Sequence, residues 1–213
     1  MMTEELIRTL ARDVKPVSRR AIERRIAVGI TAGAVITVLL IAALLGFRPD
    51  LDLAMRGFPF WMKWGYTISL GIGAVIVTTS LARPDARNLR WLWLLSAPIL
   101  LLVGIGVAEI VNAPADTLLA MWLGGSWDKC PWLVLMLSIP IFVGLLWSFR
   151  RFAPTRLRAA GAAAGLTAGA WAATLYCLHC PEVSAIFVLT WYSLGIALAT
   201  GLGALLGPRV LRW

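Results

Sequence analysis

Six long apolar runs follow one another along the chain, and each has about the 20 residues that a helix needs to cross the hydrocarbon core of a bilayer. The runs are Ile26–Gly46, Phe60–Leu81, Leu92–Val111, Pro131–Phe149, Leu157–Tyr176 and Val183–Leu206. No segment shows the alternating pattern of about ten residues that marks a strand of an outer-membrane barrel. The pattern predicts an all-α, polytopic membrane protein with six transmembrane helices. A short helical segment at residues 1–25 precedes this 26–206 domain, and a tail at residues 207–213 follows it.

The fifth run, Leu157–Tyr176, differs from the others because it is rich in Ala and Gly and is the least hydrophobic. Small residues let helix backbones approach closely inside a membrane. We therefore expect this helix to pack among other helices rather than to face lipid.

Composition and charge agree with a membrane protein and give it an orientation. Of the 213 residues 60% are hydrophobic and 15% are charged, against about 25% charged in an ordinary soluble domain. The net charge of +9 could by itself suggest nucleic acid, but 16 of the 20 Lys and Arg residues lie in the two terminal segments and in the connections at 83–90 and 150–158. Cytoplasmic loops carry such an excess, so both termini are expected in the cytoplasm.

Motifs of common enzyme and transporter classes are missing from any usable context. There is no P-loop, no HExxH and no GxSxG motif, and the single histidine is His179. Transporters and pumps usually carry ionisable residues in mid-span, whereas here Lys63 and Glu109 lie within about one turn of a span end. Glu109 as a proton-relay carboxylate is less favoured than a plain interfacial residue, and a transporter is disfavoured.

The amino-terminal segment is patterned as an amphipathic helix. Leu6, Leu10 and Val14 recur at helical spacing, Thr3 can cap the helix, and Pro16 should end it. Two interpretations stay open on the residues alone. The helix could lie on anionic lipid, or it could be a docking helix for a soluble partner.

Three cysteines, Cys130, Cys177 and Cys180, lie at the predicted outward ends of the spans, where disulfides can form. Cys130 and Cys180 each precede a proline, and proline favours the first position of a helix, so each cysteine is expected at an N-cap. A thiolate is stabilised there, which predicts reactive thiols. With His179 the cysteines also offer ligands for a soft metal, although the spacing matches no standard zinc motif. A structural disulfide is the simplest alternative.

The order of these features resembles that of the NrsF-type membrane anti-sigma factors, which are negative regulators of extracytoplasmic-function (ECF) sigma factors in proteobacteria. The resemblance rests on Leu10-Ala11-Arg12-Asp13-Val14-Lys15-Pro16-Val17, the six spans and the two Cys-Pro turns. It implies a regulator in the bacterial inner membrane, not an enzyme, that holds a sigma factor through its cytoplasmic amino-terminal part and has no direct contact with nucleic acid.

The resemblance also implies roles for individual residues. The residues expected to bind the sigma factor are Leu6, Leu10, Asp13, Val14 and Pro16. Cys130 and Cys180 would sense heavy-metal or oxidative stress and could ligate a transient soft metal ion, with His179 as an aid; no resident cofactor is expected. Cys177 matches no position of the family pattern. The partners are the sigma factor and membrane lipid, and the oligomeric state stays open.

One competing function is a membrane thiol-disulfide oxidoreductase, because Cys177-Leu178-His179-Cys180 is a C-x-x-C sequence on the oxidising side. A relay of that kind normally needs a second cysteine pair, and only Cys130 remains. The anti-sigma interpretation is therefore preferred.

Overall fold

The computed structural model describes residues 3–12, 19–82, 93–150, 152 and 154–212. Within these ranges all regular structure is helical, as predicted. The elements are α1 (Thr3–Arg12), α2 (Arg19–Leu40), the π-helical turn η1 (Ile41–Leu45), α3 (Leu51–Ala54), α4 (Phe58–Leu81), α5 (Trp93–Asn112), α6 (Leu118–Leu123), α7 (Cys130–Phe149), α8 (Leu157–Tyr176), α9 (Ala185–Phe187), the π-helical turn η3 (Val188–Tyr192) and α10 (Ser193–Val210).

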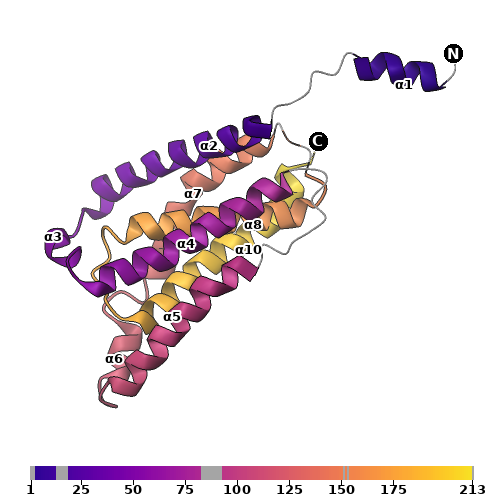
Figure 1. Ribbon diagram of the computed structural model, residues 1–213. Coiled ribbons are helices and arrows are strands. Elements are labelled where there is room, and N and C mark those ends of the chain that lie inside the picture. The colour runs from indigo at the N-terminus through magenta and orange to yellow at the C-terminus, as the bar shows by residue number, and fades with distance from the viewer. Residues whose placement is uncertain (1–2, 13–18, 83–92, 151, 153, 213) are drawn as a thin grey trace.

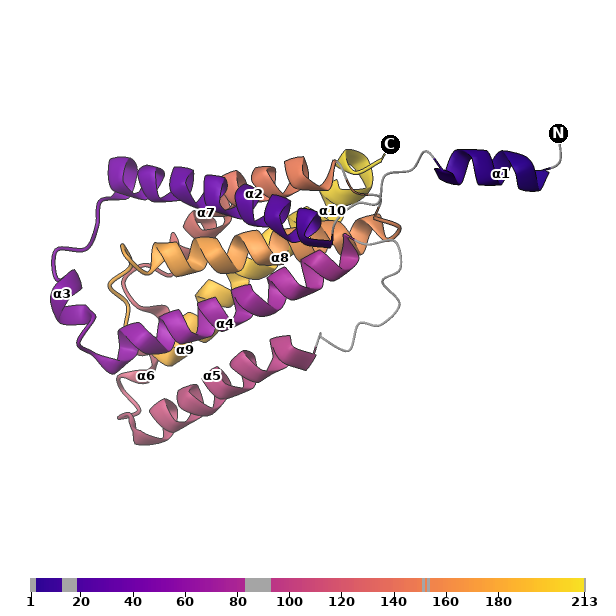
Figure 2. The ribbon, with the colours of Figure 1, turned by 45° about the horizontal axis from the view of Figure 1, so that its top comes forward.

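The long helices run up and down, so that the chain crosses the bundle repeatedly (Figure 1). The beginning of α2 and the end of α10 lie at one end of the bundle, whereas the short helices α3, α6 and α9 lie at the other. Helix α1 lies apart from the bundle, beyond the end where α2 begins (Figure 2). Both ends of the chain are therefore on one side of the helical domain.

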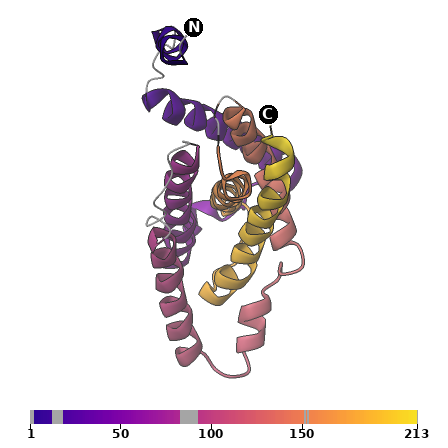
Figure 3. The ribbon, with the colours of Figure 1, turned by 90° about the vertical axis from the view of Figure 1, so that its right-hand side faces the viewer.

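Helix α8 lies in the middle of the bundle, enclosed by other helices when the molecule is viewed from the end (Figure 3). It contacts α10, α4, α7 and α2. Most of its alanines and glycines are buried, as the sequence predicted for this segment. A Cβ atom at Gly203 of α10 would overlap the carbonyl oxygen of Gly161, and one at Gly165 would overlap that of Ala199. Such backbone-to-backbone approach is open only to residues with little or no side chain.

A second close contact joins α2 to α7. A Cβ atom at Gly29 would lie 2.5 Å from the carbonyl oxygen of Gly144, so these two backbones also touch. The hydroxyl of Thr37 donates to the carbonyl of Leu137 at 3.0 Å near one end of the contact. At the other end, the hydroxyl of Ser148 donates to the carbonyl of Arg25 at 3.0 Å. These bonds join α2 to α7 between residues 25 and 37 of α2.

Five of the six predicted spans correspond to helices whose length and apolar composition suffice to cross a membrane. They are Ala21–Leu45, Phe58–Leu81, Trp93–Asn112, Cys130–Phe149 and Ala185–Val210. The remaining predicted span, the fifth along the chain, is α8, which has 20 residues but is not among the helices that are apolar enough to qualify. Alanine and glycine have little apolar surface, so they contribute little hydropathy. Their small size instead allows close packing against neighbouring helices.

The glycine contact between α8 and α10 can be tested by substitution. Gly203→Val should lower thermal stability in detergent by the equivalent of at least about 2 kcal/mol, because the new side chain must displace the backbone of α8. Gly201→Val is the matched control, since it lies on the same helix with open space around its Cβ position. It should change stability by no more than about 0.5 kcal/mol. Equal thermal unfolding midpoints for the two variants would contradict the packing.

Candidate sensing site around the three cysteines

The three cysteines meet at the end of the bundle opposite the chain termini. Cys130 is the first residue of α7, Cys177 follows the last residue of α8, and Cys180 lies in the connection between α8 and α9. All three are free thiols and are fully buried. The thiols of Cys177 and Cys180 are both near enough to Cys130 to interact with it electrostatically. Their position is consistent with the expectation that all three lie at one end of the spans.

Aromatic side chains enclose the thiols. The rings of Tyr176 and Tyr192 lie 5.7 Å apart between centroids, and the rings of Tyr176 and His179 are also 5.7 Å apart. The buried hydroxyl of Tyr192 has no hydrogen bond of ordinary geometry, and it lies against the thiols of Cys177 and Cys180. The cysteines therefore share a packed pocket of large side chains rather than an open surface.

Two expectations about thiol reactivity are corrected by these positions. The N-cap of α9 is Ser184 rather than Cys180, and the N-cap of α7 is Lys129, with Cys130 one residue inside the helix. Cys180 was expected to carry a reactive thiol at the outward end of a span, but its side chain is fully buried. Burial penalises a thiolate, and it raises the pKa of the Cys177 thiol to about 12 against the opposing charge of Lys63.

The turn that carries Cys180 is attached to the segment following η1. His179 Nδ1 lies 2.9 Å from the carbonyl oxygen of Gly46, and the backbone N–H of Arg48 donates to the carbonyl of Leu178 at 3.1 Å. Because a carbonyl oxygen can only accept, Nδ1 is the donor of this bond. In the neutral ring the free lone pair is then on Nε2, which is the atom that could ligate a metal.

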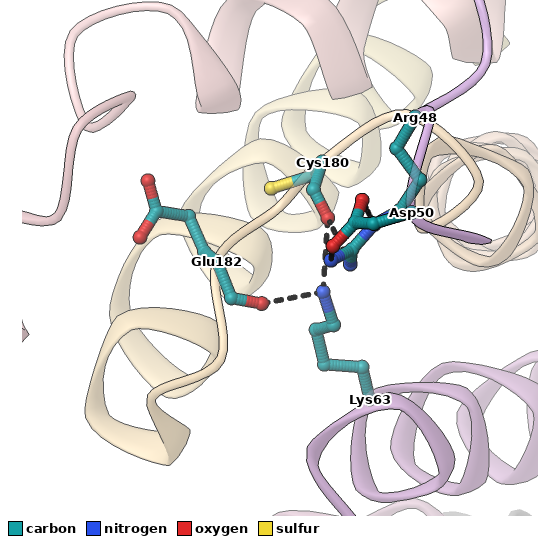
Figure 4. Close-up of polar contacts among 5 residues, drawn as sticks. All are labelled: Arg48, Asp50, Lys63, Cys180 and Glu182. Carbon is teal, nitrogen blue, oxygen red and sulfur yellow. Dashed lines mark hydrogen bonds and ion pairs between the residues drawn. The ribbon is translucent and has the colours of Figure 1, made fainter. Parts of the chain in front are cut away.

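Two cations contact the same turn (Figure 4). Lys63 of α4 is fully buried, and its ammonium donates to the carbonyls of Cys180 at 3.1 Å and Glu182 at 2.5 Å. Arg48 Nη1 lies 3.4 Å from the carbonyl of Cys180. Its Nε and Nη2 donate to the carboxylate of Asp50 at 2.8 and 2.6 Å. This pair raises the pKa of Arg48 and lowers the pKa of Asp50.

Two carboxylates hold the rest of the turn. Glu182 Oε1 accepts from the backbone N–H of Gly125 at 2.8 Å and from the hydroxyl of Ser126 at 3.0 Å, which ties the turn to the loop before α7. Glu109 Oε2 accepts from the hydroxyl of Ser184 at 3.0 Å and from the N–H of Ile186 at 3.1 Å. Glu109 therefore anchors the beginning of α9 to α5, which is a structural role.

The metal expectation is not supported by a ligand cluster. Among the described residues, no three side chains of His, Cys, Asp or Glu are grouped so that they could hold a metal ion. A soft metal ion at Cys130 and Cys180, with His179 as an aid, stays a prediction that would require these side chains to rearrange.

The expected sigma-binding residues are only partly within the described chain. Leu6 and Leu10 belong to α1, which is helical from Thr3 to Arg12; the amphipathic docking segment itself stays a prediction. Asp13, Val14 and Pro16 lie outside the described residues. On the described part of α1, Ile7 is exposed.

Sequence reasoning missed the polar network beneath the cysteines. Lys63 was expected within about one turn of a span end, but it is fully buried, and the carbonyls it contacts are 117 and 119 residues away in sequence. Only one signal pointed to it. Lys63 is the sole charged residue of its apolar run, and such a residue usually has a specific partner.

Comparison with known proteins gives a consistent family. The family described as NrsF, negative regulator of sigma F, matches residues 10–213. The "Probable anti-sigma-F factor NrsF" of Azospira oryzae is 41% identical over 214 residues, covering 100% of both chains. The "Anti-sigma-F factor NrsF" of Caulobacter vibrioides is 38% identical over 216 residues, again covering 100% of both. No solved structure matches the chain.

Burial of Cys177 predicts a characteristic pH dependence of its alkylation. Because the thiolate is the nucleophile and the pKa of this thiol is about 12, its labelling rate should rise about tenfold per pH unit between roughly pH 8 and pH 11. Rates can be measured by mass spectrometry of the detergent-solubilised chain after brief exposure to a small alkylating reagent. A plateau reached below about pH 9 would contradict the burial of this thiol.

Proposed function

Since the chain belongs to the NrsF family of negative regulators of sigma F, we propose that it holds an ECF sigma factor inactive at the bacterial inner membrane and releases it under heavy-metal or oxidative stress. The observation that carries this proposal is the match over the full chain to two relatives named anti-sigma-F factors. The helical architecture supports it, because both chain ends lie on one side of a bundle of apolar helices.

That side is proposed to be the cytoplasm, with α8 as the sixth spanning helix. The segments and connections at this end hold 16 of the 20 basic residues, which is the bias of cytoplasmic loops. A modest hydropathy is tolerable for α8 because its neighbours separate it from lipid. Six crossings then put both termini on the side where a sigma factor is found.

The sigma factor is proposed to dock on the amino-terminal segment. Helix α1 begins with Glu4 and Glu5 and ends with Arg12, so its charges match the helix dipole at both ends. Amphipathic helices commonly dock through a few apolar anchors. Leu6 and Leu10 in α1, with Asp13, Val14 and Pro16 beyond it, would supply this contact.

Stress is proposed to act on Cys130 and Cys180. An oxidant that accepts two electrons would join the two sulfurs and release two protons, and a soft metal ion would instead bridge the thiolates. Cys130 begins α7, and the far end of α7 contacts the base of α2 through Ser148 and Arg25. A shift of α7 would therefore reach the segment that carries α1.

The oxidoreductase alternative has no comparable support. Cys177 and Cys180 are fully buried, so a disulfide of a partner protein would have no access to them. The relatives are named as regulators rather than enzymes.

The docking proposal can be tested with Leu10→Asp. Losing a buried leucine anchor costs more than about 1 kcal/mol, which weakens sigma-factor binding by roughly tenfold. The variant should raise transcription from a sigma-dependent reporter without inducer and retain less sigma factor in co-purification. Arg8→Ala is the control, because Arg8 is exposed and lies on the opposite side of the helix from Leu10. Normal repression by an inserted chain lacking residues 1–20 would exclude this docking site.

The sensing proposal can be tested with the double variant Cys130→Ser and Cys180→Ser. It should still sequester the sigma factor but lose induction by thiol-reactive metals and oxidants, because no pair remains to join or bridge. Cys177→Ser should have a milder effect and serves as the comparison. The measurements are reporter induction and co-purification of the sigma factor. A full response by the double variant would reduce these cysteines to a packing role.

A further inference from the structure

The turn from Cys180 to Glu182 has an unusual way of being held in place. Pro181 at its centre has no N–H to donate and has a fixed φ, so the turn has one backbone donor fewer than usual. The carbonyls of Cys180 and Glu182 both accept from one ammonium, that of Lys63, at 3.1 and 2.5 Å. A single side chain of α4 therefore contacts the backbone on both sides of the proline.

Lys63 is also unusual as a cation. It is fully buried, and among the described residues its ammonium makes hydrogen bonds to carbonyls rather than an ion pair. A buried charge is tolerated only where hydrogen bonds compensate for lost water. For Lys63 those bonds are the two carbonyls of the cysteine turn, so displacing the turn would leave the ammonium buried without them.

Arg48 makes a weaker contact with the same turn. It reaches the carbonyl of Cys180 at 3.4 Å, while the rest of its guanidinium is engaged by Asp50. Asp50 is exposed, so Arg48 keeps a partner when the turn moves. Lys63 and Arg48 thus contact one carbonyl, but only Lys63 depends on the turn for all of its hydrogen bonds.

The position of Lys63 on α4 gives the contact a direction. Lys63 lies in the second turn of α4, which runs from Phe58 at the cysteine end to Leu81 at the end where the chain termini lie. Helix α4 packs along α8 over this length, and the hydroxyls of Thr78 and Thr167 meet at 2.9 Å near the far end. A displacement of Lys63 is therefore applied to a helix that reaches the opposite side of the bundle.

We propose that Lys63 is a positioning residue that holds Cys180 in its resting place and transmits displacement of that cysteine to α4. This inference rests on the proposed role of the cysteines in sensing. It adds a second connection across the bundle, through α4, to the connection through α7 and α2. In this proposal the contacts of Lys63 stabilise the resting conformation, in which the sigma factor is retained.

The first test measures the position of Cys180 and does not depend on signalling. The variant Lys63→Met in the full chain, reconstituted in phospholipid vesicles, is exposed to a small maleimide, and labelling of each cysteine is followed by mass spectrometry. We expect Cys180 to label at least tenfold faster than in the unsubstituted chain, and Cys130 less than threefold faster. Lys129→Met is the matched control, because it removes an exposed cation beside Cys130 and should change neither rate.

The selectivity distinguishes positioning from a general contribution to packing. A similar acceleration at Cys130 and Cys180 would mean that the bundle has loosened, and it would overturn the proposal, as would a Cys180 rate within twofold of the unsubstituted chain. If Lys63→Met fails to accumulate in the membrane, Arg48→Met decides. We expect it to accelerate Cys180 selectively by about threefold, since Arg48 is the weaker contact, and no selective change would overturn the proposal.

The second test reads the output. Lys63→Met should raise sigma-dependent transcription several-fold without inducer, and Lys63→Arg, which keeps the charge and the donors, should restore at least part of the repression. Selective labelling without any change in transcription would refute transmission to α4 and would leave the holding of Cys180 intact. Raised transcription in Lys63→Met, together with full induction in the double cysteine variant, would refute cysteine sensing rather than the contact of Lys63.

Discussion

Close contact between backbones at the middle of the bundle is the constraint on which the other features depend. Gly161 and Gly165 of α8 leave room for α10 to approach until its carbonyl oxygens meet the α8 backbone. Inside a bilayer the lipid tails are as apolar as the side chains, so the hydrophobic effect does not drive helices together. Van der Waals contact of this kind is therefore a main source of association between helices. Helices α4 and α7 pack on other sides of α8. The cysteine turn, which joins α8 to α9, therefore begins from the most constrained element of the protein.

At the cysteine end, the same turn collects the directional contacts that an apolar bundle otherwise lacks. Lys63 binds its carbonyls, Glu182 binds the loop before α7, and Glu109 binds the start of α9. Each of these charges lies in a different helix or connection. A change in the turn must therefore break or remake hydrogen bonds to several helices together, and in a medium of low dielectric such bonds are strong.

The parts of this arrangement that could be predicted from sequence are those set by local composition. Lipid-facing helices need continuous apolar runs, so the runs located the helices, and the small residues of Leu157–Tyr176 correctly indicated a central, closely packed helix. Cys130-Pro131 correctly indicated the start of α7. The equivalent inference failed at Cys180-Pro181, because residues 180–184 form no regular structure and α9 begins only after Ser184. The contacts of Lys63 were out of reach, since they join residues more than 100 positions apart.

Burial of the thiols means that a reagent cannot modify them without a change in the surrounding packing. A surface thiol can react without consequence for the fold, whereas Cys130, Cys177 and Cys180 are enclosed by Tyr176 and Tyr192. Any group added to one of these sulfurs needs volume that a close-packed interior does not have, so the reaction must move neighbouring helices. Under the proposed sensing role, the same packing that slows the reaction would make a completed reaction displace α7 and α4, which both extend from the cysteine end toward the opposite end of the bundle.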